Sequence, residues 1–419
     1  MTPELTLAPH LRSLPHSETL RINERCERLA LHRPVVRFGF GQSPFPVPDR
    51  LQRALAEHAH EKAYAPVQGL AELRTAVADF HRREDSVDWH ADRVLIGPGS
   101  KLLIYAALAA FREAHVFLTS PSWVSYAPQA QLAGHQVTRL ASRAENQWRL
   151  QPEDLAAACR TVSTALPRIL ILNFPNNPAG SSYEEAHLQA LAEVARQHEV
   201  LVISDEIYGR LHHQGAHSSF AEYYPEGTLV TGGLSKWCGA GGWRLGILHI
   251  PEALEATLKP ILLGVASETW SCVSTPIQRA AVAAYSGHPE IEQFVARQRT
   301  VLGHIGRAAT ERLNNMEVRT AFPEGGFYLF PDFELWRPAL AARGIRTAAE
   351  LCEHLLAEAG VALLPGSAFG MPADQLTTRL SYVNIDGAAA LDASTDLDTI
   401  AEPVLQGIEL IHGWLRPKV

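Results

Sequence analysis

Short apolar runs alternate with amphipathic helical stretches between about residues 90 and 250, and this alternation constrains the fold more than any other feature of the chain. Several runs are apolar throughout, which is typical of strands covered on both faces. The stretch 183–198 instead places Leu188, Leu191 and Ala195 at helical spacing. The alternation predicts a doubly wound α/β domain around a largely parallel sheet. The predicted strands are 93–96, 115–118, 136–140, 168–173, 201–205, 228–231 and 245–249.

Chemically active side chains follow these predicted strands. Doubly wound sheets bind their ligands at the carboxyl ends of the strands, where loops turn into helices. We therefore expect one site built from residues that are far apart in the chain. In chain order these residues are Ser100, Lys101, Trp123, Asn177, Asp205, Tyr208 and Lys236.

The pattern changes after about residue 290, where a long predicted helix over 291–313 is followed by mixed α and β segments. We expect a second, smaller α+β domain there, completed by the N-terminal segment. The predicted division is a large domain over 45–295 and a small domain built from 1–44 and 296–419.

Composition and charge exclude several classes of function. The chain of 419 residues has 37 Lys and Arg against 45 Asp and Glu, a net charge of −8, which argues against broad nucleic-acid binding. Its five scattered cysteines, never in CxxC spacing, are typical of a reduced cytoplasmic protein. The longest apolar run, 102–111, is too short to span a bilayer, and the N-terminus lacks the apolar core of a signal peptide. We expect a cytoplasmic protein that binds neither nucleic acid nor membrane.

Taken one at a time, the polar residues allow several interpretations. Lys236 lies in a glycine-rich loop and can be a Schiff-base amine or a solvated surface lysine. Asp205 can cap a helix or face a cationic ligand atom. Arg244 can bind an anion or form a structural ion pair. The histidines of the stretch 212–217 fit neither helix nor strand spacing, so we expect them to be exposed loop residues and expect no metal site.

Nine short motifs follow one another along nearly the whole chain, and nine in order are hard to obtain by chance. They are YAPVQGLAELR (64–74), GPGSK (97–101), PSWVSY (121–126), NFPNNPAG (173–180), SDEIYGRL (204–211), SKWCGAGGWRLG (235–246), GGFYLF (325–330), PGSAFG (365–370) and RLSY (379–382). In this order they resemble the class I aminotransferases of the aspartate aminotransferase family, which are fold type I enzymes that use pyridoxal phosphate.

The resemblance implies a pyridoxal-phosphate-dependent aminotransferase that moves an amino group between an L-amino acid and a 2-oxo acid. Lys236 would hold the cofactor as a Schiff base, and its freed amine would move the proton between the substrate Cα and the cofactor. Asp205 would keep the pyridine nitrogen protonated, which makes the ring an electron sink. Asn177 and Tyr208 would donate hydrogen bonds to the phenolic oxygen. Trp123 would stack on the ring.

The same resemblance implies donors for the cofactor phosphate. Gly99, Ser100 and Lys101 would begin a helix whose N-terminus faces the phosphate. Ser235 would add a hydroxyl and Arg244 a guanidinium that binds in bidentate fashion.

Two further implications concern the substrate and the partner subunit. Arg379 would grip the substrate α-carboxylate, assisted by Asn177 and the backbone of Gly41. In the family, the residue matching Tyr64 reaches the phosphate of the neighbouring subunit. The resemblance therefore implies a homodimer with shared active sites.

The sequence gives conflicting indications about the substrate side chain. The stretch 267–276 has no Arg or Lys, whereas animal and enteric aspartate aminotransferases carry an arginine there that binds the distal carboxylate. In another branch of the family, a lysine matching Lys101 helps to bind acidic substrates. Phe40, Phe45 and Trp270 would instead favour larger apolar side chains. We expect a half-reaction with glutamate or 2-oxoglutarate, paired with an unassigned amino acid.

Two alternatives share parts of the pattern. Another fold type I enzyme, a β-lyase or a decarboxylase, would also use Lys236 and Asp205, because the orientation of the substrate decides which Cα bond breaks. A non-catalytic aminotransferase-like sensor fits less well, because a sensor tolerates loss of the lysine that this chain retains.

Overall fold

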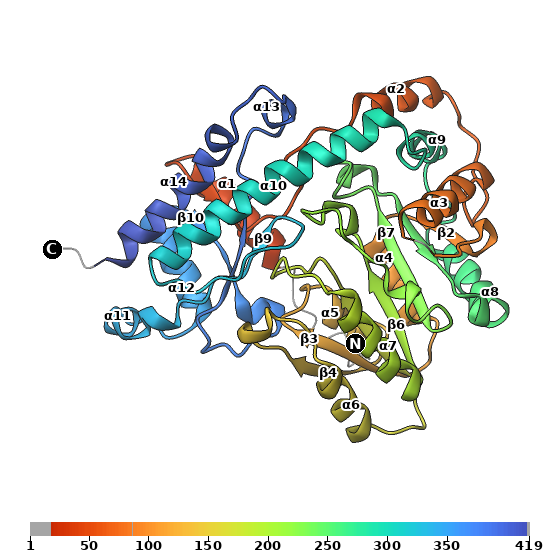
Figure 1. Ribbon diagram of the computed structural model, residues 1–419, viewed down its shortest axis with the longest axis horizontal. Coiled ribbons are helices and arrows are strands. Elements are labelled where there is room, and N and C mark those ends of the chain that lie inside the picture. The colour runs from red at the N-terminus through yellow and green to blue at the C-terminus, as the bar shows by residue number, and fades with distance from the viewer. Residues whose placement is uncertain (1–17, 86, 417–419) are drawn as a thin grey trace, which may run out of the picture.

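A mixed sheet of seven strands forms the centre of the computed structural model, which describes residues 18–85 and 87–416 (Figure 1). The strand order is β2-β8-β7-β6-β5-β3-β4. Every predicted strand is confirmed, with each end within two residues of its expected position. The strands are β2 (Val94–Gly97), β3 (His115–Ser120), β4 (Gln136–Ala141), β5 (Arg168–Asn173), β6 (Val200–Asp205), β7 (Thr228–Gly233) and β8 (Gly246–His249).

Strand β8 runs against both of its neighbours, β2 and β7, whereas the other pairs of the sheet are parallel. The segment 234–245, which joins β7 to β8, contains one 3-10 turn (Gly241–Trp243) and no helix. Without a helical crossover the chain turns back and pairs in the antiparallel sense. The doubly wound, largely parallel sheet is therefore confirmed, with one reversed strand after the loop that carries Lys236.

Helices cover both faces of this sheet. One face is covered by α4 (Ser100–Ala109), α5 (Tyr126–Leu132) and α8 (Glu252–Thr269), and the other by α6 (Pro152–Thr161) and α7 (Glu185–Gln197). On β5, Ile169 and Ile171 pack into the first of these layers, whereas Leu170 and Leu172 pack into the second. Both faces of the central strands are thus buried, which explains why their sequences lack an alternating polar position.

Segments from both ends of the described chain meet beside the sheet. Strand β1 (Val36–Arg37) pairs in parallel with β10 (Val361–Ala362). Strands β11 (Leu364–Pro365), β12 (Thr378–Ser381) and β9 (Tyr328–Leu329) form a small antiparallel sheet. The predicted long helix is confirmed as α10 (Pro289–Asn315), which packs along α14 (Leu397–Leu415) (Figure 1). Residues 1–17 of the predicted small domain lie outside the described residues, and the division near residue 295 stays a prediction.

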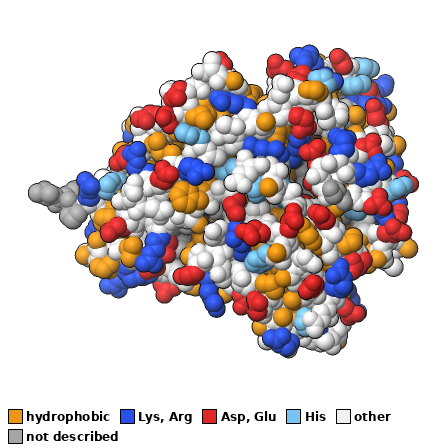
Figure 2. Space-filling view, in the orientation of Figure 1, with side chains coloured by type: hydrophobic (Ala, Val, Ile, Leu, Met, Phe, Trp, Pro, Cys, Tyr) orange, Lys and Arg blue, Asp and Glu red, His pale blue; other side chains and the backbone are white. Residues whose placement is uncertain are grey.

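The remaining helices surround these two parts. They are α1 (Glu18–Ala30), α2 (Asp49–His58), α3 (Ala71–Glu84), α9 (Thr275–Ala284), α11 (Arg337–Ala342), α12 (Ala348–His354) and α13 (Gly387–Leu391). None of the helices in the described ranges is long and apolar enough to cross a membrane. Acidic and basic side chains are interspersed over the face seen in Figure 2.

Candidate active site

A cavity of about 510 Å³ lies where the parallel strands of the sheet end. Its floor is formed by residues at or just after the ends of β5 and β6, and its opposite wall by β9 and β12 of the small sheet. All of the predicted site residues except Gly99 and Tyr64 line this one cavity. They are Gly41, Ser100, Lys101, Trp123, Asn177, Asp205, Tyr208, Ser235, Lys236, Arg244 and Arg379.

Lys236 presents its amine to this cavity without a carboxylate partner. Its Nζ donates a hydrogen bond of 3.0 Å to the carbonyl oxygen of Gly41. It also lies 5.5 Å and 5.6 Å from the ring centres of Tyr208 and Phe327. No ion pair joins Lys236 to an acidic side chain among the residues that the structure describes. The amine is therefore held by a neutral acceptor and remains available to a ligand.

Asp205 ends β6 as a buried carboxylate, with 2% of its surface exposed. The Tyr126 hydroxyl donates to its Oδ2 at 2.7 Å, and the backbone N–H of Ile207 donates to Oδ1 at 3.3 Å. Burial raises the pKa of Asp205 to about 6, while these hydrogen bonds and the charge of Lys236 oppose the rise. A buried carboxylate of this kind suits a cationic ligand atom that would stabilise its charged form.

Arg379 on β12 is a fully buried guanidinium that faces no carboxylate in the described part of the chain. It donates to the carbonyl of Gly39 at 2.7 Å and to Oδ1 of Asn177 at 3.2 Å, while its Nε has no partner. The rings of Tyr328 and Phe369 lie 4.7 Å and 5.1 Å from its Cζ. Burial lowers the pKa of this guanidinium. An uncompensated buried cation is costly, so this position is suited to an anionic ligand group.

The N-terminus of α4 forms a second anion-binding region. No side chain caps this helix end, and Gly99 before it has φ +88°. A Cβ on Gly99 would come within 2.3 Å of Nη2 of Arg244, so glycine is needed for the guanidinium to approach the helix end. Arg244 is anchored by hydrogen bonds to the carbonyls of Gly241 and Pro98. Together with the hydroxyls of Ser100 and Ser235, these groups match the donors that a phosphate dianion requires.

Lys101 adds a further cation at the edge of this region. Its Nζ lies 5.1 Å from the ring centre of Trp123, with which it shares the cavity wall. Burial, and then the charges of Arg244 and Lys236, lower the pKa of Lys101. A carboxylate bound here would relieve this accumulation of positive charge.

Tyr126, Tyr328 and Asn173 also line the cavity, although we predicted no role for them. Tyr126 is the last residue of PSWVSY and Tyr328 lies within GGFYLF, so both were inside recognised motifs. Tyr328 bonds to Tyr208, with 2.9 Å between the two hydroxyl oxygens. Asn173 donates to the backbone carbonyl of Asp205 at 2.8 Å and accepts from the backbone N–H of Asn177 at 2.9 Å, which fixes the two loops relative to each other.

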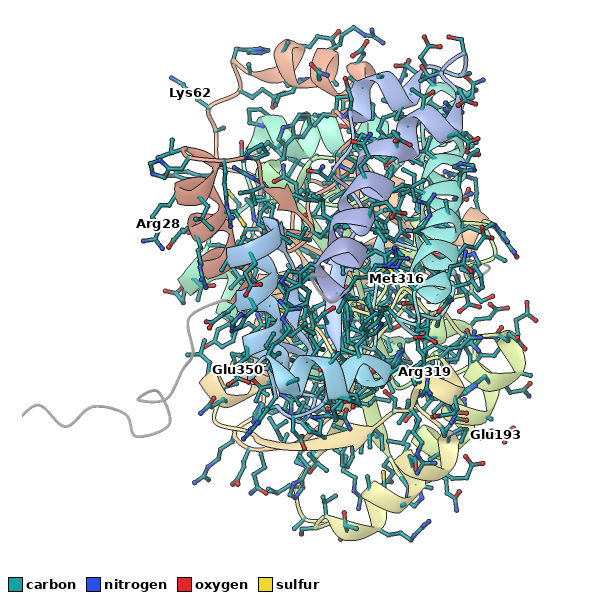
Figure 3. All side chains as sticks on the ribbon, turned by 90° about the vertical axis from the view of Figure 1, so that its left-hand side faces the viewer. Arg28, Lys62, Glu193, Met316, Arg319 and Glu350 are labelled. Carbon is teal, nitrogen blue, oxygen red and sulfur yellow. The ribbon has the colours of Figure 1, made fainter. Side chains whose placement is uncertain are left out.

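Tyr64 lies away from the cavity of its own chain, with 91% of its surface exposed. Lys62, two residues earlier, projects into solvent at the edge of the molecule (Figure 3). The segment that carries Tyr64 is therefore open to a second molecule.

Two expectations about other residues were wrong. The histidines of the stretch 212–217 are not exposed: His212 is buried, and the His217 side chain, 10% exposed, bonds to Glu206 at 3.1 Å. His212 is buried because it pairs with Gly325, and the backbone N–H of His213 donates to the carbonyl of Glu324 beside it. His217 instead packs against the ring of Phe174. Phe45 packs into the core instead of lining the cavity, whereas Phe40 does line it.

Comparisons with known proteins agree with this geometry. The model of the family "Aminotransferase class I and II" matches residues 33–389. An aspartate aminotransferase of Geobacillus stearothermophilus is 33% identical over 97% of this chain and 99% of that protein. An asparagine–oxo-acid transaminase of Streptococcus mutans is 30% identical over 95% and 97% of the two chains. The solved structure of Thermus thermophilus aspartate aminotransferase with maleate aligns with a TM-score of 0.85 at 26% identity, over 98% of this chain and all of the other.

Proposed function

The chain belongs to the class I and II aminotransferases and is a transferase of amino groups, and we propose that it works through pyridoxal 5′-phosphate held on Lys236. When bound, this cofactor supplies an electron sink that makes the Cα–H bond of an attached amino acid acidic. The groups that line the cavity match each part of the cofactor. This match supports the proposal.

The anion-binding region at the start of α4 is the proposed phosphate site. Ser100 and Ser235 offer hydroxyls, and Arg244 offers its guanidinium at the point where Gly99 lacks a side chain. We assign the first turn of α4, including the backbone N–H of Lys101, to the same phosphate.

The buried groups at the strand ends are assigned to the cofactor ring. Asp205 would pair with the ring nitrogen, because a nearby cation stabilises a carboxylate whose pKa burial has raised. Asn177 and Tyr208 would donate to the phenolic oxygen, and Trp123 would cover one face of the ring. Lys236 is the group that we propose to move the proton at the substrate Cα, since its Nζ has no carboxylate to hold it.

The observation that carries the choice of substrate is the buried Arg379, which has no carboxylate partner among residues 18–85 and 87–416. An amino acid has a carboxylate to offer this guanidinium and an amine to offer the cofactor. Asn177 accepts a hydrogen bond from Arg379 and Gly41 lines the same cavity, and both would complete the carboxylate site.

For the side chain of the substrate we propose a second carboxylate, bound by Lys101. Lys101 lies on the cavity wall beside Trp123 and is subject to repulsion from two other cations. The named relatives include aspartate aminotransferases and an asparagine–oxo-acid transaminase, whose substrates are short and polar. We therefore propose aspartate as amino donor and 2-oxoglutarate as acceptor, so that glutamate is the amino-acid product and the donor of the reverse reaction.

We propose that the enzyme is a cytoplasmic homodimer in which Tyr64 of each chain reaches the phosphate of the other. The 91% exposure of this tyrosine supports the dimer, and five free cysteines support a reducing compartment. The division into a large domain over 45–295 and a small domain from 1–44 and 296–419 is proposed on the small sheet and the pairing of β1 with β10.

A panel of amino acids tests the proposed function. The purified protein with bound cofactor is mixed with each amino acid, and the visible absorbance of the cofactor and the products are followed. We expect aspartate and glutamate to convert the cofactor to its amine form and to leave as 2-oxo acids with intact carbon skeletons. Release of ammonia and pyruvate would instead indicate a β-lyase, and loss of carbon dioxide a decarboxylase.

A further inference from the structure

The hydroxyl of Tyr328 lies between two groups of the cavity. Its oxygen is 2.9 Å from the hydroxyl of Tyr208 and 3.3 Å from the carbonyl oxygen of Gly41. A Cβ on residue 41 would come within 2.1 Å of the Tyr328 oxygen, so the glycine makes this approach possible. Tyr328 is 1% exposed, and the guanidinium of Arg379 lies over its ring, 4.7 Å from the ring centre.

Each phenol has one proton to donate, and the carbonyl of Gly41 can only accept, through either of two lone pairs. The Tyr328 proton can therefore go to the carbonyl of Gly41, at 3.3 Å, or to the hydroxyl of Tyr208, at 2.9 Å. Gly41 already accepts from Nζ of Lys236 at 3.0 Å, which is shorter than its contact with Tyr328. The shorter and less contested acceptor for the Tyr328 proton is therefore the oxygen of Tyr208.

Tyr208 is held in one orientation by its neighbours. Its ring stands nearly perpendicular to those of Phe327 and Tyr328, with ring centres 5.6 Å apart in both cases. Burial raises the pKa of Tyr208 well above its usual range, so its hydroxyl stays protonated. A hydroxyl that accepts from Tyr328 must direct its own proton elsewhere, and the open direction is the cavity.

We propose that Tyr328 is a positioning residue that donates to Tyr208 and thereby directs the Tyr208 proton into the cavity. This inference rests on the proposed function, in which Tyr208 donates to the phenolic oxygen of pyridoxal phosphate. Tyr328 acts on that oxygen only through Tyr208. It strengthens Tyr208 as a donor, because hydrogen bonds in a chain polarise one another.

The test compares Tyr328→Phe, Tyr208→Phe and the double variant. Phenylalanine keeps the ring under Arg379 and removes only the hydroxyl. Tyr382→Phe is the matched control, because Tyr382 is another fully buried tyrosine of the small-sheet region, and its hydroxyl bonds to Gly326 outside the cavity. The two readouts are the affinity of the cofactor-free protein for pyridoxal phosphate and the pH midpoint of the absorbance change of the bound cofactor.

A donor to an ionised oxygen favours the ionised form, so loss of the donor raises the pH midpoint. We expect Tyr208→Phe to raise the midpoint and to weaken cofactor affinity by roughly tenfold. Tyr328→Phe should change both readouts in the same direction but less, and Tyr382→Phe should change neither. In the Tyr208→Phe background, removal of the Tyr328 hydroxyl should have no further effect.

Three results would overturn the inference. The midpoint in Tyr328→Phe could equal that of the parent protein, it could fall, or the effect of Tyr328→Phe could persist undiminished in the double variant. Failure of the proposed function gives a different result, since the parent protein would then bind no pyridoxal phosphate with visible absorbance.

Discussion

The hydroxyl of Tyr126 lies 2.7 Å from Oδ2 of Asp205, and the two side chains come from elements 79 positions apart in the chain. Burial and the neighbouring carboxylate raise the pKa of Tyr126 well above its usual range, so this hydroxyl is a permanent donor. The hydrogen bond favours the charged carboxylate and opposes the effect of burial on Asp205. Tyr126 is therefore placed to keep Asp205 ionised in the pH range where the enzyme has to work.

Tyr126→Phe should move the pH dependence of cofactor binding upward. Burial raises the pKa of Asp205 to about 6, and loss of the Tyr126 hydrogen bond raises it further. Below its pKa, Asp205 is neutral and cannot form the proposed pair with the ring nitrogen, so cofactor affinity should fall on the acidic side. In the variant, cofactor affinity should begin to fall at a higher pH than in the parent protein. The measurement is a titration of the cofactor-free protein with pyridoxal phosphate at a series of pH values from about 5 to about 9.

Tyr183→Phe provides the control for that titration. Tyr183 is partly buried, but its hydroxyl accepts from the backbone N–H of Leu150, away from the cavity. Its pH dependence should match that of the parent protein. Identical curves for Tyr126→Phe and the parent would contradict the role of Tyr126.

Asp205→Asn should stabilise the cofactor-free protein while it destroys catalysis. The folded pKa of about 6 lies above the usual value of 3.8, so the charged carboxylate costs folding free energy that appears as the pH rises from about 4 to about 6. At about pH 8, where Asp205 is fully ionised, this loss of folding free energy is on the order of 3 kcal/mol. Thermal unfolding should therefore give a higher melting temperature for the variant at pH 8 and equal values below pH 4, roughly the unperturbed pKa. A lower melting temperature at pH 8 would refute the electrostatic explanation.

Arg379→Leu should lower kcat/KM for the amino donor by roughly two to three orders of magnitude, because the substrate carboxylate loses a charged, bidentate partner. Its cofactor affinity should remain close to that of the parent, and its melting temperature without ligands should not fall, since an uncompensated buried cation is removed. Arg379→Lys keeps the positive charge but lacks the paired N–H groups that bind both carboxylate oxygens, so it should recover only part of the activity. Steady-state kinetics measure these effects, and a change below threefold in Arg379→Leu would place the carboxylate elsewhere.

Lys101→Met should alter the choice of substrate more than the chemistry. If Lys101 binds the distal carboxylate, kcat/KM should fall by roughly tenfold or more for aspartate and glutamate but little for alanine, which lacks that group. The comparison within one variant separates this role from a role at the phosphate. An equal loss for alanine and aspartate would assign Lys101 to the phosphate alone.

Much of the fold could be predicted from the sequence because the information is local. Each central strand is an apolar run, as in 168–173, and the long helix has its own periodicity. The reversal of β8 could not be predicted, because strand direction depends on whether the connection 234–245 crosses over or turns back. The burial of His212 and His217 could not be predicted either, because the sequence of a polar loop does not show which other segment of the chain covers it.

The candidate site follows the same division. Lys236, Asp205 and Arg379 stand in motifs whose chemistry can be recognised residue by residue. Tyr126 and Tyr328 stand in motifs too, but their roles depend on hydrogen bonds to residues far away in the chain. Only the three-dimensional arrangement shows these contacts. The proposed contact of Tyr64 is not visible even in the structure of one chain, because its proposed partner belongs to another molecule.

The most direct test of the proposed mechanism is to locate the cofactor on the chain. The protein with bound cofactor is reduced with borohydride, digested and analysed by mass spectrometry, in parallel with Lys236→Ala and Lys101→Ala. We expect the reduced cofactor on the peptide that contains Lys236 in the parent and in Lys101→Ala. In Lys236→Ala we expect no covalent cofactor and a turnover lower by several orders of magnitude. A cofactor trapped on another lysine, or a Lys236→Ala variant that turns over at the parent rate, would contradict the assignment.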